Sequence, residues 1–305
     1  MKTNVIRHVV FPLLAALIWG TAFVAQSVAA DSVPPFAFSA LRSAVAVLFL
    51  LPVSRLFDLR AAKRGATAVK KTDWKLLVKS GLICGLVLSA SVNLQQTGLS
   101  DTSAGKAGFI TAFYVVLVPV LGIFLKRRAS LRVWAAVALA VGGLYLLCLK
   151  AGEGFELETS DLYVLMCAFF FAVHILCVDH FVDRVDGIKL SCAQFAVVAV
   201  VSAVCSLCFE TVDWNAVRGC VGPILYLGIG SSGIAYTLQI LSQEGSNPAV
   251  VSLLFSTESV FSVLAGAVLL HERMTGREYL GCVLMFLAVV LAQIPLKKRE
   301  KGLQT

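Results

Sequence analysis

Ten runs of mostly apolar residues, each about as long as a lipid bilayer is thick, account for most of this chain. They cover residues 9–30, 34–53, 74–97, 104–125, 131–149, 161–181, 188–209, 219–242, 248–270 and 276–294. A helix needs about 20 apolar residues to cross a membrane. The composition agrees, because 58% of the 305 residues are hydrophobic and 14% are charged, against about a quarter charged in a typical soluble domain. We therefore predict an all-α integral membrane protein with ten transmembrane helices.

The distribution of Lys and Arg predicts which side of the membrane each terminus occupies, since basic residues concentrate in cytoplasmic segments. With a cytoplasmic N-terminus, 20 of the 26 basic residues lie in or beside cytoplasmic segments and five lie in external ones. The remaining one, Arg42, lies inside the second run. We expect both termini to be cytoplasmic, in a multi-pass protein of the bacterial cytoplasmic membrane. Topology and attraction to anionic lipid explain the net charge of +8, so we expect membrane lipid and no nucleic acid as a partner.

The chain contains a weak internal repeat at an offset of 144 residues. This offset places Leu94-Gln95 on Leu238-Gln239 and places Tyr114 on Glu258. We expect two repeats, residues 9–149 and 161–294. Each repeat holds five spans, an odd number, so the two must enter the membrane from opposite sides. Inverted repeats are a common transporter architecture, with the binding site near the midplane between the halves.

Four stretches of the sequence resemble those of a known protein family. They are LIWGTAFVAQ (17–26), PFAFSALRSAVA (35–46), TSAGKAGFITAFYVVLVPVLGIF (102–124) and GIAYTLQILSQEGSNPAVVSLLFSTESVFSVLAGAVLLHERMTGREYLG (233–281). The chain resembles a drug/metabolite transporter of the EamA type, with two EamA repeats and ten helices. The resemblance implies alternating-access transport of a small metabolite, with export of amino acids or related compounds as the first expectation. An uptake carrier or exchanger for a metabolite or organic cation, and a channel, remain alternatives. We expect a small-molecule substrate and a monomer or homodimer.

Two ionisable residues lie at membrane depth. Arg42 is the ninth residue of its 20-residue run, and Glu258 is the eleventh of its 23-residue run. A central charge costs at least about 2.5–3.5 kcal/mol on insertion, so such groups face a bundle interior or a watery cavity. We predict that Arg42 binds an anionic group of the substrate and that Glu258 binds an ammonium group or carries a proton. Alternatively, the two residues pair with each other or with neutral polar groups and only hold helices together.

Neutral polar residues in the runs add candidates for the cavity. We select Asn93, Gln96, Tyr114, Tyr236 and Gln239. Asn93 and Gln96 are three residues apart and therefore share one helix face. Tyr114 is selected because it aligns with Glu258. Amides of this kind can bind a zwitterion, and they can equally join helices by hydrogen bonds.

Three further features concern proton transfer, bending and packing. His174, within the sixth run, is a second candidate for proton coupling, because histidine titrates near neutral pH. Pro119 lies inside the fourth run, where it removes one helical hydrogen bond, and we predict a hinge there. Gly81 and Gly85 form a GxxxG pair, which allows close contact between helices.

The sequence gives weaker support for an enzyme than for a transporter. Residues 230–233 read GSSG, which resembles the nucleophile motif of rhomboid proteases, and this chemistry needs a base beside Ser232. The only downstream histidine, His271, lies at the end of a run. We find no metal cluster, phosphate-binding loop or dinucleotide fingerprint in the sequence. We therefore predict neither an enzyme nor a cofactor.

Overall fold

The structure is a computed structural model. It describes residues 5–30, 32–63, 73–99, 104–126, 129–148, 158–269 and 274–293, and every regular element in these ranges is a helix. His271 and the last residues of three expected runs, 149, 270 and 294, lie outside the described residues.

The helices divide between the two halves of the chain. The first half contains η1 (Ile6–Val10), α2 (Phe11–Ala30), α3 (Pro35–Lys63), α4 (Trp74–Gly98), α5 (Ala104–Thr111), α6 (Tyr114–Phe124) and α7 (Leu131–Cys148). The second half contains α8 (Thr159–Phe181), α9 (Gly187–Phe209), α10 (Trp214–Gly219), α11 (Val221–Tyr226), η2 (Leu227–Ala235), α12 (Tyr236–Gln243), α13 (Pro248–Phe255), α14 (Glu258–Leu269) and α15 (Gly276–Gln293). Here η denotes a π-helix, which has a wider turn than an α-helix.

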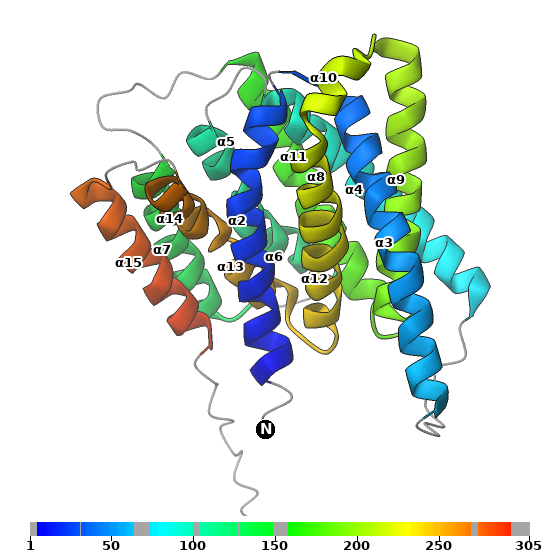
Figure 1. Cartoon of the computed structure of the whole chain (residues 1–305). Helices are drawn as coiled ribbons and strands as arrows, with labels where there is room; N and C mark the ends of the chain where they lie inside the picture. The colour runs from blue at the N-terminus through cyan, green and yellow to red at the C-terminus, as the bar shows by residue number, and fades with distance from the viewer. Residues whose placement is uncertain are drawn as a thin grey trace, which may run out of the picture.

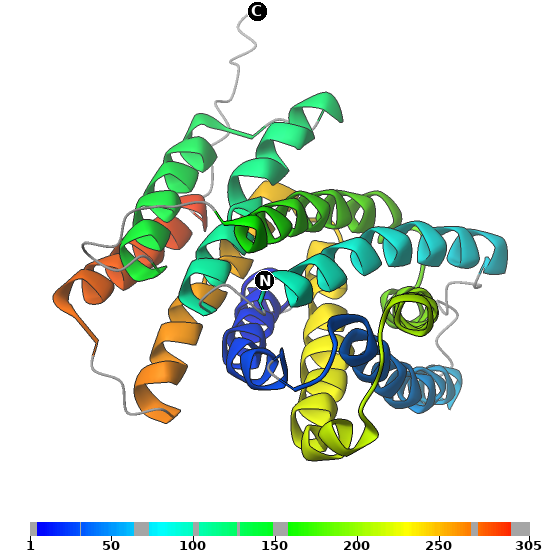
Figure 2. The same ribbon diagram turned by 90° about the horizontal axis from the view of Figure 1, so that it is seen from above.

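Nine apolar helical segments in the described part of the chain are long enough to cross a membrane, and a tenth, Leu131–Leu147, is shorter. The prediction of an all-helical membrane protein is therefore confirmed. The segments run roughly alongside one another, with α7 and α15 at one end of the bundle and α3 and α9 at the other (Figure 1). Seen from above, α4 and α8 lie side by side across the molecule (Figure 2).

Contacts between the halves occur in matched pairs, as inverted repeats require. The contact of α2 with α14 corresponds to that of α6 with α8, and the contact of α3 with η2 corresponds to that of α4 with α9. The pairs α3–α9 and α7–α15 each join the equivalent helices of the two halves. Helices of one repeat therefore pack against helices of the other, and residues from both halves meet in the middle of the bundle.

Small residues set the distance between α4 and α9. A Cβ added at Gly81 would lie 2.6 Å from the Cβ of Ala193, and one added at Gly85 would lie 2.6 Å from the Cβ of Val197. Real Cβ atoms do not approach this closely, so only glycine allows the observed packing. The close contact expected of this GxxxG pair is confirmed.

The fourth and ninth spans are each broken in the middle. The fourth is interrupted at residues 112–113, between α5 and α6, and the ninth at residues 256–257, between α13 and α14. The two breaks are 144 residues apart, which is the offset of the repeat. Pro119, the hinge expected from the sequence, lies inside α6 and not at the break.

The backbone changes its hydrogen bonding in the same way at both breaks. The Phe113 amide donates to the carbonyl oxygen of Ile110 at 3.1 Å, and the Thr257 amide donates to that of Leu254 at 3.3 Å. Each bond reaches back three residues instead of four, which tightens the turn. As a result, Tyr114 and Glu258 each occupy the first position of a new helical segment in the middle of the bundle.

Candidate functional site

A cavity lies between the two repeats at the level of the helix breaks. Its empty volume is about 510 Å³, including the part that opens to solvent. It is lined by Trp19, Phe23, Gln26, Arg42, Gln95, Thr111, Tyr114, Phe171, Ile175, Ser231, Tyr236, Gln239, Phe255 and Glu258. Five of the residues selected from the sequence are among them: Arg42, Tyr114, Tyr236, Gln239 and Glu258. The charged and polar lining residues come from both halves of the chain.

Glu258 and Tyr114 meet directly in this cavity. The Tyr114 hydroxyl donates to Oε1 of Glu258 at 3.1 Å, and both side chains are buried. The sequence alignment had placed these two residues at equivalent positions of the two repeats. Equivalent residues of an inverted repeat can touch only close to the pseudo-two-fold axis that relates the halves. The cavity therefore lies on this axis, where each repeat contributes the first residue of its second half-helix.

Arg42 enters the cavity from α3. Its side chain is 4% exposed, and NH1 donates to Oε1 of Gln26 at 3.2 Å. The guanidinium also lies over the ring of Phe38, 5.9 Å from its centroid. Arg42 and Glu258, both of which the structure describes, form no ion pair with each other; each is bonded to a neutral partner. The cavity thus contains one basic and one acidic side chain that are not paired with each other.

Gln95 and Gln239 form a second pair of equivalent residues in the cavity wall. Gln95 donates to the Thr111 hydroxyl at 3.4 Å, and Gln239 donates to Oε1 of Gln243 at 3.4 Å. Gln95 was not selected from the sequence. The signal was present, because the 144-residue offset aligns Leu94-Gln95 with Leu238-Gln239.

Aromatic rings form much of the remaining wall. The Trp19 ring packs edge-on against Tyr236, at 4.9 Å between centroids, and against Phe255, at 5.4 Å. Two fully buried polar atoms of wall residues have no hydrogen-bond partner among the described residues: Nε1 of Trp19, a donor, and Oε1 of Gln239, an acceptor. A buried polar group without a partner is unfavourable by about 1–3 kcal/mol, so both atoms favour a polar ligand. Trp19 was also missed as a site residue.

Asn93 and Gln96 lie outside the cavity lining. Asn93 donates to the Ser202 hydroxyl of α9 at 2.9 Å, and Gln96 donates to the carbonyl oxygen of Gln26 in α2 at 3.4 Å. Both side chains therefore join helices, which is the alternative that the sequence left open. Gln95, which lies between them in the sequence, is the α4 amide that lines the cavity.

His174 is fully buried behind the cavity wall. Its Nε2 lies 3.0 Å from Oε1 of Gln194, and its ring packs against Tyr236 at 6.2 Å between centroids. It is therefore not a lining residue, but it contacts Tyr236, which is one. Among the described residues, no group of three or more His, Cys, Asp or Glu side chains is arranged to hold a metal ion.

Comparison with known proteins agrees with this architecture. The model of the EamA-like transporter family matches residues 7–149 and again 159–293. An uncharacterized transporter of Archaeoglobus fulgidus is 29% identical over 287 residues, covering 92% of this chain and 84% of the relative. The uncharacterized transporter YoaV of Bacillus subtilis is 24% identical over 293 residues, covering 93% and 96% of the two chains.

The fold is also known from experiment. A crystal structure of a protein 21% identical in sequence superimposes with a TM-score of 0.76, covering 94% of this chain and 96% of the other. At this identity the likeness shows the fold alone. The two family matches, however, cover nearly all of the chain, and the family consists of transporters and not of enzymes. The protein is a multi-pass integral membrane protein that belongs to the EamA-like transporter family.

Proposed function

We propose that this transporter exports a small zwitterionic metabolite, with amino acids as the first candidates, by alternating access. The observation that carries the proposal is the presence of one basic and one acidic side chain in the same cavity. Arg42 and Glu258 both line it, both are at most 5% exposed, and neither is paired with the other. A buried charge in the middle of a membrane protein is unfavourable unless it has a partner. A ligand with one anionic and one cationic group would supply both partners.

The chemistry of the lining assigns a role to each group. The planar guanidinium of Arg42 suits two parallel hydrogen bonds to a carboxylate. The carboxylate of Glu258, positioned by Tyr114, suits an ammonium group. The free acceptor of Gln239 and the free donor of Trp19 would complete the polar contacts, and the aromatic rings would contact the apolar part of the substrate.

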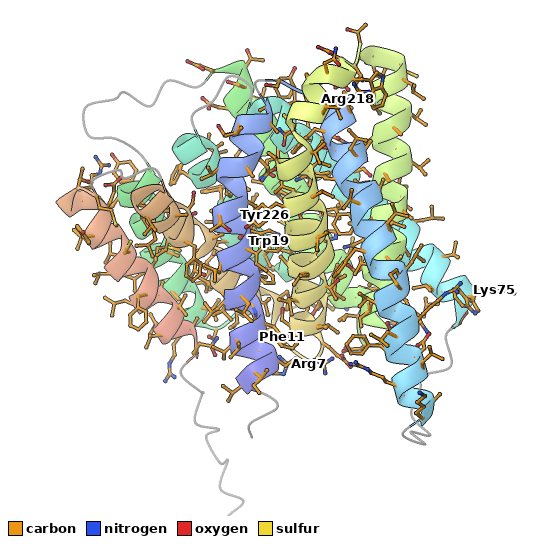
Figure 3. The ribbon with its side chains drawn as sticks, viewed as in Figure 1. Arg7, Phe11, Trp19, Lys75, Arg218 and Tyr226 are labelled. Atoms are coloured by element: carbon orange, nitrogen blue, oxygen red, sulfur yellow. The ribbon has the colours of Figure 1, made fainter. Side chains whose placement is uncertain are left out.

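The repeat architecture supports alternating access, in which the halves rock around one central site. The cavity lies between the repeats, and the broken helices supply points at which each half can bend. Pro119 in α6 remains a candidate hinge beside them. Figure 3 places Arg7 and Lys75 toward one face of the bundle and Arg218 toward the other, in keeping with the proposal that the termini face the cytoplasm.

Coupling to protons would use Glu258. Among the described side chains, Tyr114 is its hydrogen-bonding partner, so a proton and a substrate ammonium group would compete for the same carboxylate. His174 is the second candidate, acting through Tyr236. In the outward-facing state a proton from outside would displace the substrate to that side, and in the inward-facing state the proton would leave to the cytoplasm and free the carboxylate for the next substrate.

Purified protein in liposomes tests the proposal. Liposomes loaded with one unlabelled amino acid at a time should take up the same labelled amino acid by counterflow, and the uptake should saturate. A channel would instead conduct without saturation, and a failure of all amino acids would refute the substrate class. Reversing an imposed amino-acid gradient would then report the preferred direction of transport.

Glu258→Gln tests whether Glu258 carries the proton. We expect this variant to lose accumulation driven by a pH gradient, because a glutamine cannot release a proton. The matched control is Glu278→Gln, at the exposed start of α15, where the carboxylate only accepts bonds from Thr275. If pH-driven accumulation survives in Glu258→Gln, the proton is carried elsewhere, and His174→Gln becomes the next variant to measure.

A further inference from the structure

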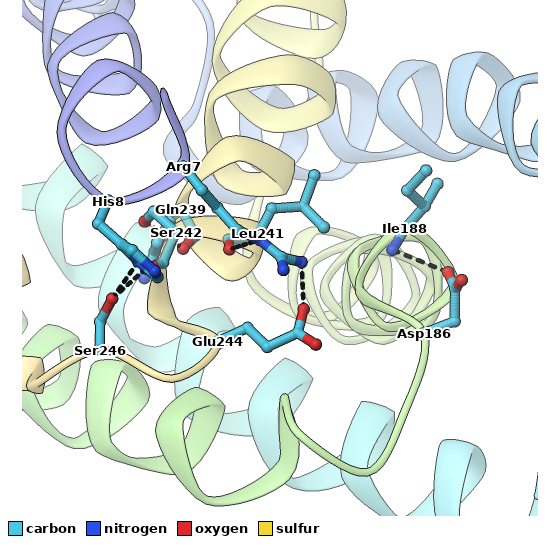
Figure 4. A network of polar contacts seen from close by, with 9 residues as sticks. All are labelled: Arg7, His8, Asp186, Ile188, Gln239, Leu241, Ser242, Glu244 and Ser246. Carbon is cyan, nitrogen blue, oxygen red and sulfur yellow. Dashed lines mark hydrogen bonds and ion pairs between the residues drawn. The ribbon is translucent and has the colours of Figure 1, made fainter. Parts of the chain in front are cut away.

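A cluster of polar side chains connects the two repeats at the end of the bundle where α2 begins. Arg7, in η1, forms an ion pair with Glu244, which directly follows α12. The Nε of Arg7 also donates to the carbonyl oxygen of Leu241 at 2.9 Å. His8 lies 3.2 Å from the carbonyl oxygen of Ser242 through Nδ1 and also contacts the Ser246 hydroxyl. Figure 4 shows these contacts bridging the start of α2 and the end of α12.

The cluster and the cavity lie at different depths along the same two helices. On α2, the first residue of the cavity wall is Trp19, twelve residues after Arg7 and therefore about 18 Å further along the helix. Figure 3 shows Arg7 below Phe11, the first residue of α2, and Trp19 near the middle of α2. On α12, Tyr236 and Gln239 line the cavity, and Glu244 lies just beyond the end of the helix.

A layer of packed apolar side chains borders the cavity, because it includes the cavity-wall residues Tyr114, Ile175 and Phe255. Its other buried members include Ala15 of α2, Val118 of α6, Leu176 of α8 and Val251 of α13, so it draws on both repeats, and Ala15 lies between Arg7 and Trp19 along the chain. Gln243, at the end of α12, donates to the carbonyl oxygen of Ile175 at 2.8 Å. At this end of the bundle the cavity is therefore closed first by apolar packing and then by the polar cluster.

We propose that the Arg7–Glu244 cluster is a latch that holds this end of the cavity closed and must open once in every transport cycle. The inference rests on the proposed alternating-access function and names the contact that controls access to its site. Opening the cavity toward this face requires α2 to move away from α12 and α13, and such a movement would break the bonds from Arg7 and His8. The ion pair suits this role because the two side chains are 36% and 33% exposed. Partly exposed pairs are weak enough to break reversibly.

Hydrogen exchange measured by mass spectrometry on the protein in nanodiscs tests the latch without any substrate. In Arg7→Ala and in Glu244→Ala, we expect amides of α12 and α13 to exchange about threefold to tenfold faster, because the open state becomes more populated. The double charge reversal, Arg7→Glu with Glu244→Arg, should restore most of the protection. Arg60→Ala is the control, since it removes an exposed basic side chain near the same face without touching α12.

Three results would overturn the inference. Faster exchange confined to residues 5–10 would mean that the pair only fastens the end of α2. Unchanged exchange in both single variants would mean that the apolar layer alone keeps this end closed. If amides in the charge-reversal variant exchange as fast as in the faster single variant, the ion pair is not what keeps this end closed. Glu244→Gln, which keeps the shape of the side chain, replaces Glu244→Ala if that variant folds poorly. Because no transport is measured, an absence of amino-acid counterflow would refute the proposed substrate and leave this test intact.

Discussion

The hydrogen bond between Tyr114 and Glu258 can be measured as a coupling free energy between the two repeats. Tyr114→Phe removes only the hydroxyl, and because Tyr114 is buried in a packed wall, phenylalanine fills the same volume. Glu258→Met removes the acceptor and keeps a side chain of similar length. With both single variants and the double variant, a thermodynamic cycle isolates the bond from the other effects of each substitution.

The structure sets the expected magnitude of this coupling. The oxygen atoms are 3.1 Å apart and both residues are almost completely buried. A hydrogen bond between neutral groups contributes about 0.5–1.5 kcal/mol, and one to a charged group about 1.5–3 kcal/mol. The cycle therefore also reports the state of Glu258: the lower range indicates a protonated carboxyl group and the upper range an ionised one.

Reversible unfolding in mixed detergent micelles, followed by circular dichroism, gives the four free energies of unfolding. The control cycle uses Thr111→Val with Gln95→Met, a neutral pair at 3.4 Å in the same cavity, for which we expect less than about 1 kcal/mol. A Tyr114–Glu258 coupling below about 0.3 kcal/mol, the level at which independent sites simply add, would refute the contact at the pseudo-two-fold axis.

Two further substitutions test how the site is held in place. Gly20→Ala would put a Cβ 2.6 Å from the carbonyl oxygen of Glu258, so we expect a loss of about 1–3 kcal/mol in the free energy of unfolding; Gly142→Ala, which meets no atom within 4 Å, should show no loss. Glu210→Ala should lower the same free energy by about 1–2 kcal/mol, because its carboxylate accepts two backbone amides at the start of α3 at 2.8 Å each, and an unchanged free energy would show that water replaces these bonds.

The sequence predicted those parts of the fold that the bilayer itself imposes. Each span needs an apolar run of a fixed length, so the spans could be counted without tertiary information. The charges at membrane depth were visible for the same reason, since Arg42 and Glu258 stand out in apolar runs. The alignment of Tyr114 with Glu258 was the reason for selecting Tyr114 as a cavity residue, and in the structure the Tyr114 hydroxyl donates to Glu258.

The sequence did not indicate which face of each helix points into the bundle. A helix surrounded by lipid is apolar on all sides, so the amphipathic pattern that orients a helix in a soluble protein is absent. Consequently Gln96 was selected in place of Gln95, although the repeat alignment favoured Gln95. The helix breaks were missed for a different reason. Residues 112–113 are Ala-Phe, neither of which is a helix breaker, and Pro119 drew the prediction seven residues further on.

The break at residues 256–257 shows how a helix can be interrupted without glycine or proline. The hydroxyl groups of Ser256 and Thr257 donate to the carbonyl oxygens of Leu253 and Leu254, and such back-bonding bends helices. The first break lacks these hydroxyl groups and has the same backbone hydrogen bonds. Tertiary packing around the axis must therefore impose the break on the first repeat. Because inversion places both breaks at the same depth, each repeat delivers one side chain to the axis, and a hydroxyl from one half can then position a carboxylate from the other.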